Sequence, residues 1–237
     1  MSRCVGIPKA SEAVRAEWLH RVAAEYRSAA LAQHLTLWLT QIAAPPELVT
    51  DGLRIAADEM KHAEMSFDVF TAAGGTAMPD IHRETLAITR KRQPLEHQIL
   101  LSGVEIFCLG ETIAVRLFRR LRQHCDVAPA KKALDRILRD EVRHRDFGWT
   151  LLEWMLSTPG EAEYRKQLDS KLPAMLKRLR QGYGGIAGDA ASQSTSPFPA
   201  EDRRWGLMPH SEYADAVTET FARDYGPRFS DLDIDIS

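Results

Sequence analysis

Cysteine is scarce in this chain of 237 residues, and the few that are present do not form metal or redox pairs. Cys4, Cys108 and Cys125 stand far apart, and none belongs to a Cys-x-x-Cys motif. This spacing argues against a disulfide framework, a zinc knuckle and a rubredoxin-like iron site. The fold must therefore be held together by its apolar core, for which the chain is long enough.

Strong net charge and long apolar runs are also missing. The formal net charge is -2 at pH 7, which leaves no field to draw the protein to nucleic acid or to an anionic membrane. No apolar run reaches the roughly 18 residues that a membrane span needs, and the N-terminus lacks the charged-then-apolar plan of a signal peptide. We therefore expect a cytoplasmic protein with no nucleic-acid partner and no membrane span.

The apolar periodicity predicts an all-α protein. Ser11 can cap a first long helix, and four long helices are expected at about 14–43, 46–74, 94–124 and 129–156. A fifth helix is expected to end near residue 181, with a kink or break at Pro173 and then a flexible loop over 182–199. We expect one domain over residues 1–237, with a bundle over about 11–157 and further packed helices over about 160–225, the last at about 211–225.

Two copies of one motif stand out within the expected helices. Asp58-Glu59-Met60-Lys61-His62 recurs as Asp140-Glu141-Val142-Arg143-His144, and both read Asp-Glu-x-basic-His. Residues three apart share one face of a helix, so each copy directs a carboxylate and an imidazole the same way. This is metal-ligand spacing, and the repetition on two helices indicates an internal duplication.

Each motif helix follows a helix with a carboxylate at matching height. In the first pair Glu25 is the expected donor, because it lies alone among alanines. In the second pair the choice is between Glu105 and Glu111. Glu111 is level with the second motif, whereas Glu105 would lie about 9 Å further along the helix and about 120° around it. We therefore expect Glu111 to face inward and Glu105 to be either a carboxylate that supports the ligands from outside or a structural one.

Six residues, Glu25, Glu59, His62, Glu111, Glu141 and His144, thus form the predicted metal site. Carboxylates and imidazoles together suit iron or manganese better than structural zinc. We expect two iron ions, with mixed Mn/Fe and Mn/Mn left open. Asp58 and Asp140 are expected to accept the free imidazole N–H groups and fix the tautomers.

This ligand set resembles that of the ferritin-like non-haem di-iron carboxylate proteins. Asp-Glu-x-Arg-His looks like the form found in their oxygen-activating members, and the long connection over 75–93 fits the single long crossover of a ferritin-like four-helix bundle with extra C-terminal helices. The overall layout is most similar to the aldehyde-deformylating oxygenases.

The resemblance implies an O2-activating di-iron oxidase or oxygenase, acting on a small organic, apolar substrate with electrons from a ferredoxin or reductase. Deformylation, hydroxylation, N-oxygenation and desaturation all stay open, as do a ferroxidase or iron-storage role and a manganese-catalase-like role. We expect a monomer or homodimer. Residues that could line the substrate pocket are Phe70, Phe107, Cys108 and Thr112.

Overall fold

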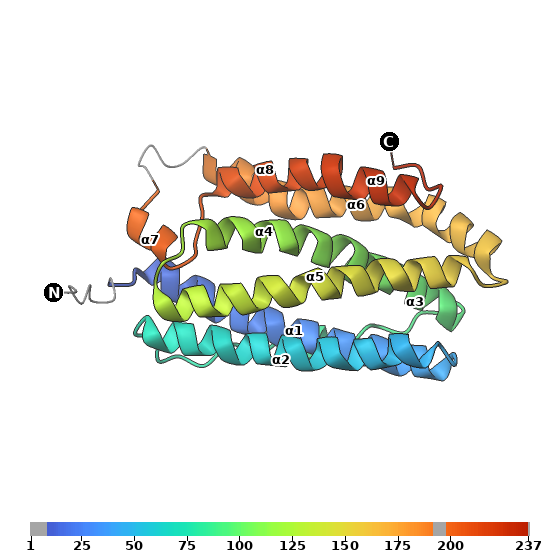
Figure 1. Ribbon diagram of the computed structural model, residues 1–237, viewed down its shortest axis with the longest axis horizontal. Coiled ribbons are helices and arrows are strands. Elements are labelled where there is room, and N and C mark those ends of the chain that lie inside the picture. Colours follow the sequence, from blue (N-terminus) through green and yellow to red (C-terminus); the bar gives the residue numbers. More distant parts are fainter. Residues whose placement is uncertain (1–8, 192–197, 237) are drawn as a thin grey trace.

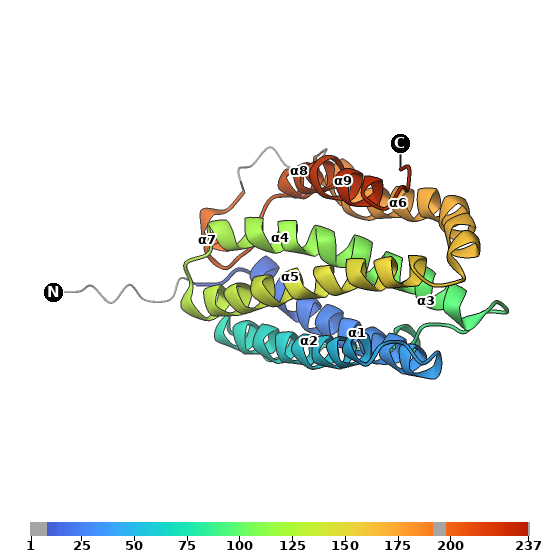
Figure 2. The same ribbon diagram turned by 45° about the vertical axis from the view of Figure 1, so that its right-hand side comes forward.

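The computed structural model describes residues 9–191 and 198–236, and over these residues it is helical with no strand. Figure 1 shows three layers: α1 and α2 lie in one, the helices from α3 to α5 in the next, and α6, α8 and α9 in the third. Figure 2 shows the same order after rotation. The all-α prediction is confirmed.

The first layer is a helical hairpin. α1 (Glu12–Gln41) begins where the hydroxyl of Ser11 accepts a hydrogen bond from the Val14 amide at 3.1 Å, as predicted for the cap. The turn after α1 places Ala43 at a positive φ of 54°. α2 (Pro46–Ala72) then starts with proline in its first turn, where the missing N–H costs nothing.

The second layer contains one long helix in three parts and its antiparallel partner. After the short 3₁₀ turn η1 (Arg83–Thr85), α3 (Leu95–Gly103) continues into the π-helix η2 (Val104–Glu111) and then into α4 (Thr112–Gln123). α5 (Ala128–Leu156) returns beside it and also packs on α2. The predicted long helices are all present, but the sequence did not predict the π-helical segment.

The helix Leu95–Gln123 corrects one expectation. By length and mean hydropathy alone it is apolar enough to cross a membrane, although we expected no such segment. However, 67% of its most apolar window is buried inside the protein, and the core helix of a bundle passes the same test. Its composition is therefore weak evidence for a span.

The third layer differs from the prediction in detail. α6 (Glu161–Ala191) runs through Pro173 and past residue 181, so the flexible loop expected from residue 182 is wrong as far as Ala191, while 192–197 lie outside the described residues. Figure 2 shows α6 bending along its length, as an internal proline favours. The other elements of this layer are α7 (Ala200–Arg204), α8 (His210–Thr220), the π-helix η3 (Phe221–Tyr225) and α9 (Gly226–Ser230).

The core consists of two apolar clusters that take residues from different ends of the long helices. One contains Leu39, Leu100 and Leu152, and the other contains Trp18, Ile113 and Leu134. Each large apolar side chain removed from water stabilises the fold by about 1.5–3 kcal/mol. Along each helix the ionisable motif residues lie between these clusters, so the bundle carries its buried polar groups at mid-height.

Candidate metal centre

The six predicted ligand residues come together at this mid-height. Glu25 comes from α1, Glu59 and His62 from α2, Glu111 from the last position of η2, and Glu141 and His144 from α5. All six are buried: both histidines are 0% exposed, and Glu111, the most exposed, is 8% exposed. The side chains therefore form an ionisable cluster shielded from solvent.

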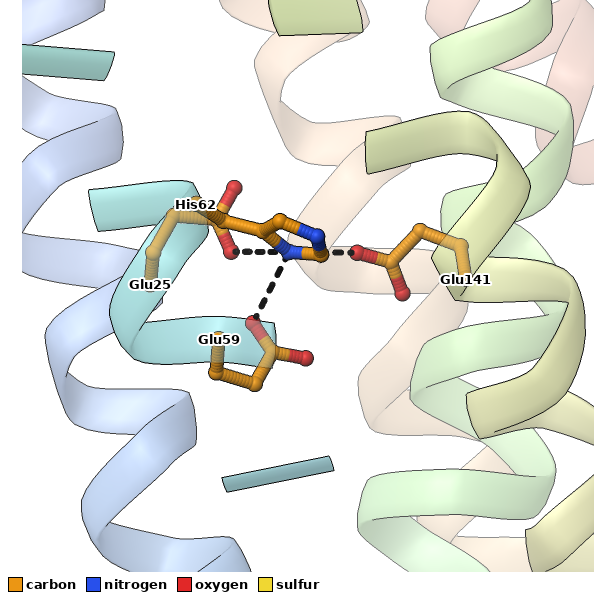
Figure 3. A group of neighbouring side chains, drawn as sticks. All are labelled: Glu25, Glu59, His62 and Glu141. Carbon is orange, nitrogen blue, oxygen red and sulfur yellow. Dashed lines mark ion pairs between the residues drawn. The ribbon is translucent and has the colours of Figure 1, made fainter. Parts of the chain in front are cut away.

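The Nδ1 atom of each histidine faces the carboxylates of the cluster. In Figure 3, His62 Nδ1 lies 3.5 Å from Glu59, 3.7 Å from Glu141 and 4.0 Å from Glu25. His144 Nδ1 lies 2.9 Å from Glu59 and 3.4 Å from Glu141. Glu59 and Glu141 thus approach both imidazoles and occupy the centre of the cluster.

Two overlapping sets of side chains are able to hold a metal ion. In each set the ligand atoms lie within 4.8 Å of one another. One set is Glu25, Glu59, His62 and Glu141, and the other is Glu59, Glu111, Glu141 and His144. The sets share Glu59 and Glu141, each of which has two carboxylate oxygens to offer.

Several of these buried polar atoms have no hydrogen-bond partner among the described residues. They are Oε2 of Glu59, Oε2 of Glu141, Nδ1 of His62 and both ring nitrogens of His144. An unsatisfied buried polar group is costly, so such a concentration requires an explanation. Cations bound by these atoms would satisfy them, and the donor set of carboxylate oxygen and imidazole nitrogen fits iron or manganese.

Without metal, raised pKa values favour the protonated forms of Glu25, Glu111 and His144. Burial, together with the neighbouring carboxylates, raises the pKa of Glu25 and Glu111 well above the usual value. Burial opposes ionisation of Glu59, but the nearby imidazoles of His144 and His62 outweigh it and lower the pKa of Glu59 to about 2. Burial likewise disfavours an imidazolium, yet the close carboxylates of Glu141 and Glu59 raise the pKa of His144 to about 10. Bound metal ions would displace these protons.

The π-helix explains how Glu111 reaches the cluster. The wider π turn ends at Glu111, and such segments interrupt the regular α-helical spacing of side chains. The hydroxyl of Tyr225 donates a hydrogen bond of 2.5 Å to the carbonyl of Leu109 within this segment. Glu105, the alternative ligand, is exposed and pairs with Arg178 at 2.7 Å. The structure therefore places Glu111 in the cluster and Glu105 outside it.

Close packing fixes this π-helix against α5. A Cβ added to Gly148 would lie 2.7 Å from the carbonyl carbon of Phe107 and 2.8 Å from the Cys108 amide nitrogen. The Cys108 thiol donates to the Gly148 carbonyl at 3.2 Å. Only glycine permits so close an approach, which holds Glu111 near Glu141.

The two motif aspartates act across the helix pair. Asp140 of α5 lies 3.1 Å from Nε2 of His62 on α2, and Asp58 of α2 lies 3.7 Å from Nε2 of His144 on α5. A carboxylate at Nε2 favours the tautomer that carries its proton there and leaves Nδ1 free for the cluster. Asp58 and Asp140 thus stand where the sequence predicts such carboxylates, but each contacts the histidine of the other motif.

Two arginines that sequence reasoning missed hold these aspartates. Arg136 donates to Asp140 through Nε and to Asp58 through Nη2, the second at 2.9 Å. Arg143 donates from Nη2 to Asp58 at 3.0 Å and to Asp140 at 2.6 Å. The sequence did offer a signal, because Arg136 precedes Asp140 by one helical turn and Arg143 occupies the basic motif position. Both arginines therefore orient the carboxylates that contact the imidazoles.

The expected pocket residues pack elsewhere. Phe70 belongs to one apolar cluster, Phe107 packs edge-to-face on Phe147, Cys108 bonds to the α5 backbone, and Thr112 accepts a hydrogen bond from the Trp149 indole at 3.0 Å. None of the four lines the cavity that reaches the cluster. These side chains lie on helix faces directed into the packed core.

A cavity of about 780 Å³ instead reaches the cluster from the side of α1 and η2. Its wall includes the carboxylates Glu25, Glu59, Glu111 and Glu141. Its other lining residues include the exposed Arg27, Glu84 and Glu105 and the apolar Leu31, Ile88, Ile106 and Phe118. A volume of this size suits a small organic molecule.

Comparisons with known proteins give no relative for this chain: no protein-family model matches it, and neither a curated protein nor a solved structure matches it.

Proposed function

We propose that this protein is a ferritin-like di-iron oxidase or oxygenase that uses O2 to oxidise a small organic substrate. The observation that carries the proposal is the pair of overlapping ligand sets, which share Glu59 and Glu141 and contain one histidine each. The long connection between α2 and α3 and the duplicated motif support the ferritin-like assignment.

Each ligand residue has a definite task in this proposal. Glu59 and Glu141 would contribute to both metal sites, while Glu25 and His62 would complete one and Glu111 and His144 the other. Four carboxylates would nearly neutralise two divalent ions. When bound, the iron ions supply the binding and reduction of O2, which protein side chains cannot perform.

The surrounding residues set the conditions for this chemistry. Asp140 at Nε2 of His62, and Asp58 near Nε2 of His144, favour imidazole protons directed away from the cluster, and Arg136 and Arg143 hold both aspartates. The apolar clusters above and below keep water from the buried carboxylates. The cavity over Glu25 and Glu111 gives a substrate access from one side. In this proposal a ferredoxin or reductase supplies the electrons.

The test is anaerobic titration of metal-free protein with Fe(II), followed by elemental analysis and O2 uptake with a panel of small organic substrates. We expect binding to stop at two ions per chain, and one substrate class to accelerate O2 consumption. Glu105→Gln is the matched control, because Glu105 lines the same cavity outside the cluster. Absence of iron binding, or iron binding without O2 reduction, would refute the proposal.

Gel filtration separates an iron store from a substrate enzyme. A store requires a hollow shell of about a dozen or more subunits, because a mineral core must be enclosed. A monomer or homodimer that stops at two ions is the expected result. A large shell that takes up many irons per chain in air would favour storage.

A further inference from the structure

Arg21 is a buried arginine, and one nitrogen of its guanidinium group lacks a hydrogen-bond partner among the described residues. It lies on α1 one turn before Glu25 and is 5% exposed. Its Nε donates to Glu17 at 2.9 Å, its Nη2 donates to the Gly206 carbonyl at 3.1 Å, and its Cζ lies 4.4 Å from the centre of the Trp18 ring. These contacts fix the guanidinium group in one position.

The remaining nitrogen, Nη1, makes no hydrogen bond of acceptable geometry within the described part of the chain. Tyr213 lies close enough to interact with the guanidinium, but it does not satisfy Nη1. A buried donor on a charged group is costly to leave unpaired. An unpaired nitrogen on a side chain that is otherwise held rigidly therefore indicates a binding partner outside the described residues.

The position of Arg21 identifies where that partner would lie. Arg21 lines the cavity whose wall includes all four cluster carboxylates. The same cavity is lined by Leu31, Ile106 and Phe118, which offer apolar surface. A molecule in this cavity can therefore contact a fixed cation, an apolar wall and the cluster carboxylates together.

We propose that the substrate is an organic monocarboxylate with an apolar body, and that Nη1 of Arg21 binds its carboxylate. This proposal rests on the proposed function, which supplies the oxidation of the substrate at the cluster. It deepens that function by naming the substrate class. Charge-assisted hydrogen bonds to carboxylates are among the strongest that a side chain makes. A monoanion fits better than a dianion, because Glu17 and the cluster carboxylates already lie close by.

Tyr183 is a second polar contact in the same cavity. Its side chain lines the cavity together with Arg21 and the cluster carboxylates. A protonated hydroxyl can donate a hydrogen bond to a bound carboxylate, whereas a phenolate would repel it. Tyr183 therefore assists Arg21 as a positioning residue.

The experiment compares octanoate with octanamide, which has nearly the same shape but no charge. Binding is measured by calorimetry to protein loaded with Zn(II), which does not react with O2. We expect wild-type protein to bind octanoate about 10- to 100-fold more tightly than octanamide, as for loss of a charge-assisted hydrogen bond. Equal binding of the two molecules, or no octanoate binding, would overturn the proposal without any variant.

Two arginine variants give the matched comparison. Arg21→Gln should weaken octanoate binding by about tenfold or more and abolish the preference over octanamide. Arg27→Gln removes the same charge from an exposed residue of the same helix and cavity, and it should change octanoate binding by less than about threefold. Equal losses in both variants would show a general charge effect and refute a site at Arg21.

Arg21→Lys guards against misfolding, since it keeps the charge and most of the side chain. It should fold and bind octanoate with intermediate affinity, because lysine cannot reproduce the guanidinium fork. Arg21-dependent octanoate binding in a protein that never consumes O2 would support this site and refute the oxidase. O2 consumption by a protein that does not distinguish octanoate from octanamide would support the oxidase and refute this site.

Discussion

α2 and α5 carry the same motif, but their basic residues behave in opposite ways. On α5, Arg136 and Arg143 both reach Asp58 and Asp140. On α2, the residues at the matching offsets are Arg54 and Lys61, and each pairs on its own helix, with Asp51 at 2.9 Å and Glu64 at 2.6 Å. The duplication thus preserves the cluster residues, whereas the arginines that hold the two aspartates come from α5 alone.

This difference teaches which part of the repeat the site depends on. The glutamates and histidines face one another, so both copies must be kept for a shared cluster. The aspartates need only one pair of cations between them, and α5 supplies both. Both arginines hold both aspartates, but the Asp140 side chain is 2% exposed, whereas that of Asp58 is 17% exposed. We therefore expect the two halves to respond unequally to mutation outside the cluster.

The largest expected effect separates the shared glutamates from the outer ones. Glu59→Ala and Glu141→Ala should each abolish binding of both ions, because both ligand sets contain these residues. Glu25→Ala and Glu111→Ala should each leave one ion, because each removes a ligand from one set. Elemental analysis after iron loading measures the difference. Two ions retained by Glu59→Ala would contradict the assignment of the cluster.

The next prediction concerns the stability of the metal-free protein. His144 has a folded-state pKa of about 10, above the usual 6.5. The stability that this shift contributes is fully present below pH 6.5 and is lost as pH rises through 10. The raised pKa values of Glu25 and Glu111 act in the same direction. The melting temperature of metal-free protein should therefore fall over this range.

Metal loading should reverse this pH dependence, because ligands bind metal in their deprotonated forms. The melting temperature of loaded protein should not fall between pH 6.5 and 9. A His144→Gln variant provides the control, since its metal-free form should show a shallower decline than the wild type. A metal-free protein that grew more stable with rising pH would contradict the proton-holding cluster.

A smaller effect should distinguish the two aspartates. Asp140→Ala should weaken metal binding by roughly 10- to 100-fold, and Asp58→Ala should lie at or below the lower end of that range. The reason is that Asp140 lies 3.1 Å from the His62 ring nitrogen, whereas Asp58 lies 3.7 Å from that of His144. Competition with a chelator measures both affinities. Equal losses would remove the asymmetry, and unchanged affinities would make both aspartates ordinary charged residues.

The smallest effect compares arginines at matching positions of the repeat. Arg136→Gln should weaken metal binding by less than about tenfold, because it acts through the aspartates. Arg54→Gln should leave metal binding unchanged, because exposed ion pairs contribute about 0–1 kcal/mol to folding and this one does not reach the cluster. The same chelator competition applies. If Arg54→Gln lost as much metal affinity as Arg136→Gln, the conclusion that α5 alone holds the aspartates would be wrong.

Much of the cluster was predictable because its residues depend on helical periodicity. A Glu-x-x-His pair shares one helix face whatever surrounds it, and Glu25 was distinctive as a lone carboxylate among alanines. Glu111 was preferred over Glu105 from its height on the helix, and the structure agrees with that position. Arg21 was overlooked, since no local pattern shows that one nitrogen of a buried arginine lacks a hydrogen-bond partner among the described residues.

The sequence by itself determined the all-α class, the order of the long helices and the shared face of each Glu-x-x-His pair, because these follow from spacing along one helix. Only the tertiary structure decided that Asp140 contacts His62, that η2 widens before Glu111 and that the cavity lies beside Arg21. These features depend on how far neighbouring helices are rotated and how closely they approach, as at Gly148 against Phe107. Packing of side chains distant in the sequence sets both quantities.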